Sequence, residues 1–257
     1  MKLGNDISAV VAGGAKGLGA AAAEKLAEAG CKVAILDMYR EEGEALARRI
    51  GGIYRHLEIS SEITVDTALD FAREEHGLER ILVNCAGVAI DQPAVWRDQA
   101  TGKIKLHDVP SFERLLQVNL TGTFYMATKS AAAMMSLPPL DGGIRGLIIN
   151  SASLAAEDGQ AGQSAYAASE GGVLALTRPL ARDLVDDGIR VVTIMSGRYD
   201  TAIFAERSED MTQKIQTSEM DPSVLADPAE FAETVLNVIR DDTINGQWVR
   251  MKSARSR

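Results

Sequence analysis

Three glycines between the first apolar run and the first helical pattern have the spacing of a phosphate-binding turn. Gly13, Gly17 and Gly19 lie in the string VVAGGAKGLGA. Glycine permits a tight turn and lets the backbone approach a pyrophosphate, and the free N–H groups and dipole of the following helix favour the anion. An ordinary structural turn would also explain three glycines, so the next strand decides between the two interpretations.

That next apolar run ends at Asp37. A carboxylate at this place can accept hydrogen bonds from both ribose hydroxyls of an adenosine, and it repels a 2′-phosphate. The glycine turn and Asp37 together predict a dinucleotide site that takes NAD in preference to NADP. Lys16, inside the turn, is the one residue that favours the phosphorylated cofactor.

The elements that must position this site alternate along the chain. Strand-like apolar runs occur at residues 7–11, 32–36, 81–84, 147–150, 191–195 and 248–251, with a weaker one at 53–59. Helical patterns occur at 17–29, 41–49, 62–76, 112–137, 165–186 and 228–240. Strict alternation predicts an α/β fold, a doubly wound parallel sheet of about seven strands with helices on both faces. A polar insertion at 91–110 and a loop at 138–146 do not divide the chain, so we expect a single domain over residues 1–257.

Composition narrows the function classes. Of 257 residues, 46% are hydrophobic and 25% charged, which is enough to bury a core and excludes disorder as the main state. The net charge of −9 disfavours nucleic acid as a partner, and no apolar run reaches the roughly 20 residues of a membrane span. No secretory pattern precedes the first strand, and Cys31 and Cys85 alone favour a reducing, cytoplasmic location. The three histidines lack the spacing of a metal site.

Several motifs follow one another in the order typical of a known family. They are the GxxxGxG turn, the string NCAG at 84–87, Asn119, Ser153 and Tyr166, thirteen residues after the serine. In this order they resemble the short-chain dehydrogenase/reductase family over essentially the whole chain. More narrowly, segments 141–166 and 227–251 resemble the type II 3-hydroxyacyl-CoA dehydrogenases, which also oxidise some hydroxysteroids. The resemblance implies a Rossmann-like fold, NAD as cofactor, a small-molecule substrate and a homotetramer.

The resemblance also implies roles for individual residues. In the family a serine holds the substrate oxygen, a tyrosine transfers the proton, and an asparagine in the preceding helix anchors a water relay. A lysine four residues after the tyrosine promotes the phenolate and binds the nicotinamide ribose. Ser153, Tyr166 and Asn119 occupy three of these places, whereas Glu170 stands in place of the lysine.

Further positions are implied to contact cofactor or substrate. The cofactor positions are Gly13, Lys16, Gly17, Leu18, Gly19, Asp37, Glu58, Ile59, Asn84, Cys85, Ala86, Gly87, Tyr166, Tyr199 and Thr201. The substrate positions are Ser153, Gln160 and Gln163.

Glu170 reverses the sign of the charge where this chemistry needs a cation. Tyr166 and Glu170 are four residues apart, so they share one face of a helix. A cation about 5 Å from the phenol favours the phenolate by roughly 3 kcal/mol at an effective dielectric constant near 20, whereas an ionised glutamate disfavours it. We therefore predict strongly reduced dehydrogenase turnover unless Glu170 is protonated or another cation substitutes.

Three functions stay open on the sequence. The leading one is an NAD-dependent oxidoreductase that interconverts a secondary alcohol and a ketone, with a 3-hydroxyacyl-CoA or hydroxysteroid-like substrate. The alternative is a catalytically impaired, dinucleotide-binding pseudoenzyme or scaffold subunit. A non-redox reaction of the halohydrin type is disfavoured, because such relatives lose the glycine turn that this chain keeps.

Overall fold

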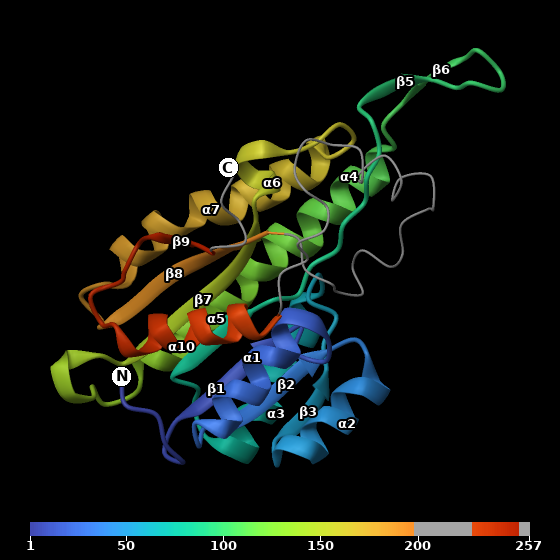
Figure 1. The fold of residues 1–257 in the computed structure, drawn as a ribbon. Helices are drawn as coiled ribbons and strands as arrows, with labels where there is room; N and C mark the ends of the chain where they lie inside the picture. The colour runs from blue at the N-terminus through green and yellow to red at the C-terminus, as the bar shows by residue number, and fades with distance from the viewer. Residues whose placement is uncertain (198–227, 252–257) are drawn as a thin grey trace.

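Seven parallel strands form the central sheet of the computed structural model, which describes residues 1–197 and 228–251 (Figure 1). In spatial order they are β3 (Ile53–His56), β2 (Lys32–Asp37), β1 (Ser8–Ala12), β4 (Ile81–Asn84), β7 (Gly146–Ser153), β8 (Ile189–Ser196) and β9 (Trp248–Arg250). The chain builds outward from β1 in one direction and then from β4 in the other. This is the doubly wound order, so the predicted architecture is confirmed.

Helices cover both faces of the sheet. One face carries α1 (Gly17–Glu28), α2 (Arg40–Ile50) and α10 (Pro228–Arg240). The other carries α3 (Glu62–His76), α5 (Thr123–Met135) and α7 (Ser164–Leu184). In β1, Val11 packs toward the first group and Val10 toward the second. Because both faces are covered, the central strands β1 and β4 are buried along their whole length and form continuous apolar runs, which the sequence reveals.

The helix predicted at 112–137 consists of three consecutive segments. They are α4 (Val109–Leu115), the π-helical segment η1 (Leu116–Gly122) and α5. Asp108 caps α4, since its Oδ2 accepts a hydrogen bond from the Ser111 backbone N at 3.0 Å. At the end of η1, a Cβ added to Gly122 would lie 2.8 Å from the Ile59 carbonyl oxygen, so the close packing there requires glycine.

Several boundaries differ from the prediction. β7 and β8 continue to Ser153 and Ser196 because they pair with each other over eight residues. β3 ends at His56, short of residue 59. The helix predicted at 165–186 runs from Ser164 to Leu184, and Gly188, with φ +69°, lies between it and β8.

The polar insertion at 91–110 contains a hairpin that the sequence prediction lacked. β5 (Val95–Arg97) and β6 (Ile104–Leu106) pair antiparallel. Each strand has only three residues, which is too short for an alternating pattern to be recognised. The short helix α6 (Ala155–Asp158) and a 3₁₀ turn at Asp141–Gly143 complete the described elements.

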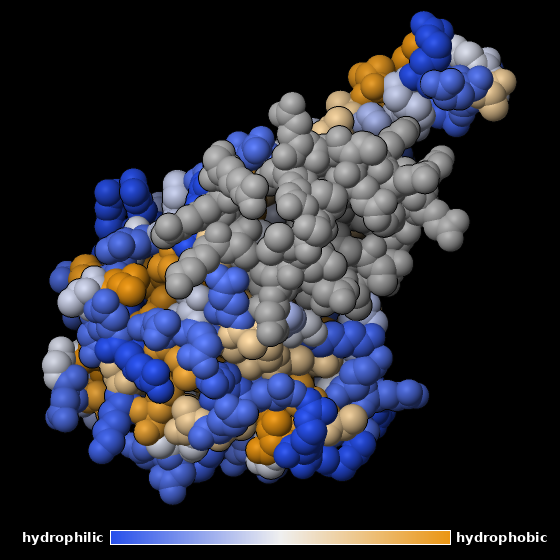
Figure 2. Space-filling view, viewed as in Figure 1, coloured by the Kyte–Doolittle hydropathy of each residue, from blue (hydrophilic) through white to orange (hydrophobic). Residues whose placement is uncertain are grey.

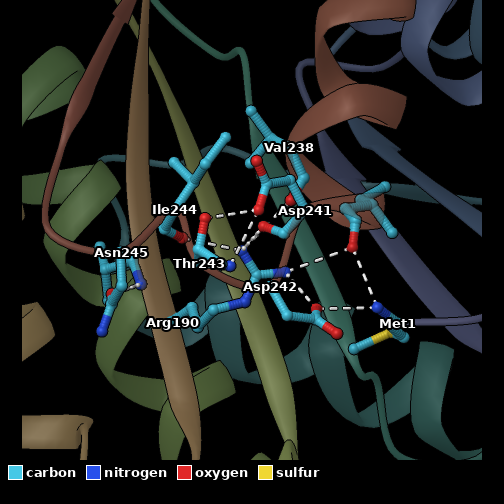
Figure 3. A network of polar contacts seen from close by, with 10 residues as sticks. Met1, Arg190, Val238, Asp241, Asp242, Thr243, Ile244 and Asn245 are labelled. Atoms are coloured by element: carbon cyan, nitrogen blue, oxygen red, sulfur yellow. Dashed lines mark hydrogen bonds and ion pairs between the residues drawn. The ribbon is translucent and has the colours of Figure 1, made fainter.

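Arg190 in β8 ties the C-terminal end of α10 to the sheet (Figure 3). Its Nη1 donates to the carbonyl oxygens of Val238, Asp241 and Ile244 at 3.1, 3.2 and 2.8 Å. Its Nη2 lies 3.1 Å from Asp242 Oδ1. Desolvation lowers the pKa of this buried guanidinium although Asp242 and Asp241 oppose the shift. Arg190 therefore satisfies carbonyl groups that the end of a helix leaves without an intrahelical partner.

Within the described ranges, no helix is long and apolar enough to cross a membrane. The same residues contain no cluster of three or more His, Cys, Asp or Glu side chains that could hold a metal ion. Cys31 and Cys85 are both free thiols.

Candidate active site

A cavity of about 390 Å³ opens at the carboxyl ends of the central strands. Toward β2 it is lined by the glycine turn and Asp37, and toward β7 by Ser153, Tyr166 and Glu170. Open parallel sheets bind ligands at this edge, beside the point where the winding direction reverses. One cavity therefore brings together the two groups of residues that the sequence singled out.

The glycine turn is packed so closely that it excludes side chains. Gly13 has φ +72°, and an added Cβ would lie 2.4 Å from the Ala86 backbone N. A Cβ on Gly19 would lie 2.1 Å from the Gly13 carbonyl oxygen. Gly17 begins α1, and among the described residues no side chain caps this helix at Lys16. The first N–H groups of α1 therefore remain available to an anion beside the cavity.

Asp37 lines the cavity and also supports the turn. Its Oδ2 accepts a hydrogen bond from the Ala15 backbone N at 2.8 Å, and its Oδ1 accepts one from the Tyr39 backbone N at 3.1 Å. A carboxylate has about four acceptor positions, so each oxygen can accept a second hydrogen bond. The geometry fits the predicted contact with two ribose hydroxyls.

Lys16 also lines the cavity, but its charge has a partner. Its Nζ lies 2.7 Å from Glu42 Oε1 and 3.8 Å from the centroid of the Tyr39 ring. The hydrogen bond with Glu42 raises the pKa of Lys16. The residue that favoured NADP in the sequence is therefore balanced by a neighbouring carboxylate.

Further positions that the resemblance assigns to the cofactor line the same cavity. They are Leu18, Glu58, Ile59, Cys85, Ala86 and Gly87. Glu58 Oε1 accepts a hydrogen bond from Ser60 Oγ at 2.7 Å, which fixes the carboxylate at the cavity wall. Burial raises the pKa of the Cys85 thiol well above its usual range, so Cys85 is a small wall residue and no reactive thiolate.

Asn84, predicted to bind the cofactor, does not line the cavity. Its Nδ2 donates to Asn150 Oδ1 at 2.9 Å, and the two residues are register partners in β4 and β7. Both side chains are buried, and within residues 1–197 and 228–251 Asn84 Oδ1 and Asn150 Nδ2 have no hydrogen-bond partner. The sequence could not reveal this pair, because the register between β4 and β7 joins residues 66 positions apart.

At the other end of the cavity, Glu170 is bound to the backbone of Ser153. The Ser153 N donates to Glu170 Oε2 at 2.7 Å, across the gap between β7 and α7. Ser153 Oγ accepts a hydrogen bond from the Ala155 backbone N at 3.2 Å and lines the cavity. Tyr166, half-buried in the first turn of α7, lines the cavity one helical turn before Glu170.

Asn119 lies behind this group without lining the cavity. Its Nδ2 donates to the Val88 carbonyl oxygen at 2.9 Å and to Ser169 Oγ at 3.0 Å, and it lies 3.4 Å from Glu170 Oε1. Its Oδ1 accepts a hydrogen bond from the Val88 backbone N at 2.8 Å. Asn119 therefore joins η1 to the loop after β4 and to α7.

Burial changes the charge that Glu170 carries. The side chain is only 7% exposed, and this desolvation raises its pKa from 4.5 to about 7, although the Ser153 N–H favours the carboxylate. At neutral pH about half of the Glu170 carboxyls are therefore protonated. The sequence predicts strongly reduced turnover unless Glu170 is protonated. Near pH 7, the raised pKa allows protonation of part of the Glu170 population.

Of the three predicted substrate residues, Ser153 lines the cavity, whereas Gln160 and Gln163 do not. Gln163 is 8% exposed, and its Oε1 accepts a hydrogen bond from the Gln160 backbone N at 3.0 Å. Gln163 therefore closes the turn before α7. Tyr199 and Thr201 lie outside the described residues.

Some lining residues were missed in the sequence. Arg114 and Val118 reach the cavity from α4 and η1, and Met38 and Tyr39 follow Asp37 along its rim. Arg114 and Val118 are four residues apart, so helical spacing could have placed them on one face. Only the course of α4 past the cavity, which is a tertiary feature, identifies that face.

Comparisons with known proteins agree with this arrangement. Residues 8–212 match the family model described as short chain dehydrogenase. The chain is 40% identical over 248 residues to the 3-hydroxyacyl-CoA dehydrogenase type-2 proteins of Rattus norvegicus and Homo sapiens, covering 96% of this chain and 94% of each relative. The crystal structure of 3-hydroxyacyl-CoA dehydrogenase type-2 from Mycobacterium avium superposes with a TM-score of 0.85 and 34% identity, over 98% of this chain and 96% of that one. This chain belongs to the short-chain dehydrogenase/reductase family of oxidoreductases.

Proposed function

We propose that the chain is an NAD-dependent oxidoreductase that interconverts a secondary alcohol and a ketone, with turnover limited by Glu170. The observation that carries the proposal is the single cavity shared by the glycine turn, Asp37, Ser153 and Tyr166. The names of its relatives favour a 3-hydroxyacyl-CoA substrate, and a hydroxysteroid-like substrate is compatible with the same chemistry.

The residues fit a dinucleotide. The uncapped start of α1 suits a pyrophosphate, and Asp37 has acceptor positions free for a ribose. NAD is favoured over NADP, because Asp37 repels a 2′-phosphate and Lys16 already pairs with Glu42. When bound, NAD supplies the chemistry of hydride acceptance, and NADH that of hydride donation.

The chain's own residues handle the proton and orient the substrate. Ser153 Oγ is accessible from the cavity and can donate a hydrogen bond to the substrate oxygen. Tyr166 takes the hydroxyl proton in oxidation and returns it in reduction. Asn119 in η1 binds both α7 and the loop that follows β4, and so fixes these three segments relative to one another around Ser153 and Tyr166.

Glu170 makes this chemistry dependent on pH in an unusual direction. Ionised, it disfavours the Tyr166 phenolate one turn away; protonated, it adds no opposing charge. With a pKa of about 7, about nine-tenths of Glu170 is ionised at pH 8 and about one-tenth at pH 6. The inhibition by Glu170 is therefore strongest in the alkaline range where alcohol oxidation otherwise becomes easier.

A second candidate function, the impaired dinucleotide-binding subunit, is favoured by the same carboxylate. Glu170 accepts a hydrogen bond from the Ser153 N–H and lies beside Asn119. Rotating its side chain away from Tyr166 would break these contacts and therefore cost free energy. If no other cation compensates, cofactor binding persists while turnover is lost.

Two measurements separate these functions. Calorimetric titration with NAD tests binding, and we expect saturable binding that Asp37→Ala weakens at least tenfold. Single-turnover oxidation of a 3-hydroxyacyl-CoA by the NAD complex then tests chemistry. Binding without any turnover at pH 6 identifies the impaired subunit, and absence of NAD binding contradicts both candidates.

Substitution at position 170 tests the electrostatic argument. At pH 8 we expect the rate of the chemical step to rise about tenfold or more in Glu170→Gln, which removes the charge. It should rise further in Glu170→Lys. Glu157→Gln, an exposed glutamate outside the cavity, serves as the matched control. A wild-type rate at pH 8 equal to that of both position-170 variants would show the electrostatic argument to be wrong.

A homotetramer and a cytoplasmic location belong to the same proposal. Exposed apolar side chains on α5, at the end of α7 and on the edge strand β9 support self-association, namely Phe124, Val185 and Trp248, which are 42, 54 and 42% exposed. Sedimentation equilibrium of the purified chain measures this state directly.

A further inference from the structure

The hairpin of β5 and β6 projects from one end of the molecule (Figure 1). Figure 2 shows hydrophobic residues at the surface of this projection, side by side with strongly hydrophilic ones. We call residues 95–106 the arm. It serves none of the site chemistry described above, because no arm residue lines the cavity.

The register of the arm places its apolar side chains on one face. Val95 pairs with Leu106, and Arg97 pairs with Ile104. Directly opposite residues share a face of an antiparallel ribbon, as do residues two apart along a strand. Val95, Ile104 and Leu106 therefore share one face with Arg97, and these three apolar side chains are 60, 56 and 69% exposed.

The tip of the arm is ordered by its own polar contacts. Asp98 Oδ1 accepts hydrogen bonds from the backbone N of Ala100 at 3.1 Å and of Thr101 at 2.8 Å. Arg97 Nη1 donates to the Gly102 carbonyl oxygen at 2.8 Å, and Lys105 forms an ion pair with Asp98. The apolar face is thus presented on a formed ribbon.

An exposed apolar face of this kind is expected to bind another surface. A lone two-stranded ribbon is marginally stable in water, and an exposed apolar strand is a site of association. At the foot of the arm, Val109 and Phe112 in α4 are a further 63 and 38% exposed.

We propose that the apolar face of the arm binds a second copy of this chain. The arm carries Arg97, Lys103 and Lys105 against a single acid, Asp98, whereas the whole chain has a net charge of −9. The acidic body of a second copy therefore complements the basic arm. In a twofold symmetric dimer, the arm of each copy would contact the body of the other copy. The same arm-to-body contact would therefore occur twice in the dimer.

This inference is independent of the proposed function, since it requires neither cofactor nor turnover. It is also distinct from self-association through α5, α7 and β9, because the arm is a separate part of the surface.

Sedimentation equilibrium of the full chain tests the arm. The test variant is Leu106→Lys, and the control is Ile63→Lys, which puts the same charge at an apolar residue of α3 that is 78% exposed. We expect the dissociation constant of self-association to rise at least tenfold for Leu106→Lys, and to stay within about twofold for Ile63→Lys. A wild-type chain that stays monomeric at about 100 μM, or equal constants for wild type and Leu106→Lys, would overturn the proposal.

Photo-crosslinking identifies the occupant. A benzophenone amino acid replaces Leu106 in an unlabelled chain that is mixed with ¹⁵N-labelled wild type. We expect crosslinked peptide pairs that join the arm to the body of the labelled copy. Crosslinks confined to one chain would overturn the proposal, as would binding of the arm to anionic lipid vesicles in the absence of self-association.

Discussion

The buried Glu170 carboxyl makes the stability of the fold depend on pH in a direction opposite to that of most carboxylates. Its pKa is raised from 4.5 to about 7 in the folded chain, so between these values the folded state binds more protons than the unfolded state. Stability from this group is therefore fully present below pH 4.5 and is lost as the pH rises through 7. The full change corresponds to about 3 kcal/mol at 1.36 kcal/mol per pKa unit.

Much of this change in the free energy of unfolding falls between pH 5.5 and 8.5. Integrating the proton linkage between pH 5.5 and 8.5 gives a loss of about 2 kcal/mol in the free energy of unfolding from Glu170 alone. Glu170→Gln removes the titration and keeps an amide oxygen to accept from the Ser153 N–H. The difference in unfolding free energy, wild type minus variant, should therefore fall by about 2 kcal/mol across this range.

Urea denaturation of the ligand-free chain at constant ionic strength measures this difference. Other groups that titrate in the range cancel in the subtraction. Glu74→Gln, an exposed residue of α3, is the matched control and should give a flat difference. A difference for Glu170→Gln that changes by less than about 0.5 kcal/mol would refute the buried-carboxyl argument, because it would mean that Glu170 titrates as it does in the unfolded chain.

Three further predictions concern the cofactor turn and the fold. Asp37→Ser should lower the ratio of NAD affinity to NADP affinity at least tenfold in calorimetric titrations, since it removes the carboxylate that excludes a 2′-phosphate; an unchanged ratio contradicts the assigned selectivity. Gly19→Ala should abolish NAD binding because its Cβ would lie 2.1 Å from a backbone oxygen, whereas Gly171→Ala, with its nearest neighbour at 3.8 Å, should bind NAD as the wild type does. Arg190→Lys should lower the free energy of unfolding by about 3 kcal/mol in urea denaturation, because one ammonium cannot satisfy the same carbonyl groups, while the exposed Arg240→Lys should change it by less than about 0.5 kcal/mol.

Local sequence determines the backbone of the glycine turn and the end of β2, which line the cavity. The positive φ of Gly13 and the start of α1 at Gly17 follow from neighbouring residues, whereas the close packing of Gly13 against Ala86 is a tertiary contact. Asp37 ends a strand whose apolar run is visible in the sequence. The doubly wound class could be predicted because the strands of the main sheet alternate with helices, and only the hairpin of β5 and β6 interrupts this alternation between β4 and α4.

The parts that depend on register or on burial were not predictable. Asn84 resembles a cofactor ligand until its strand is paired with β7, which turns its amide toward Asn150. Gln163 resembles a substrate ligand until the turn before α7 forms, in which its side chain accepts a hydrogen bond from the Gln160 backbone N. The arm strands, with three residues each, contain too few side chains for a periodicity.

Glu170 shows why a sequence pattern alone does not determine charge. From the sequence, a glutamate at a lysine position implies an anion that opposes the Tyr166 phenolate. In the folded chain the same side chain is desolvated between β7 and α7, and its two nearest polar partners, the Ser153 N–H and Asn119 Nδ2, are neutral donors. Neutral donors stabilise a carboxylate less than a cation does, so desolvation prevails and the carboxyl titrates near pH 7.

The Ser153 N–H limits what restoring lysine can achieve. A lysine ammonium offers only donors, so in Glu170→Lys the Ser153 N–H loses its acceptor, whereas Asn119 Nδ2 keeps the Val88 carbonyl oxygen and Ser169 Oγ. The gain from the positive charge is therefore opposed by one donor left near it, unless the longer lysine side chain extends past it into the cavity. Glu170→Gln keeps an acceptor for Ser153 and removes only the charge, so comparing the two variants separates the electrostatic effect on Tyr166 from the structural role of the carboxylate.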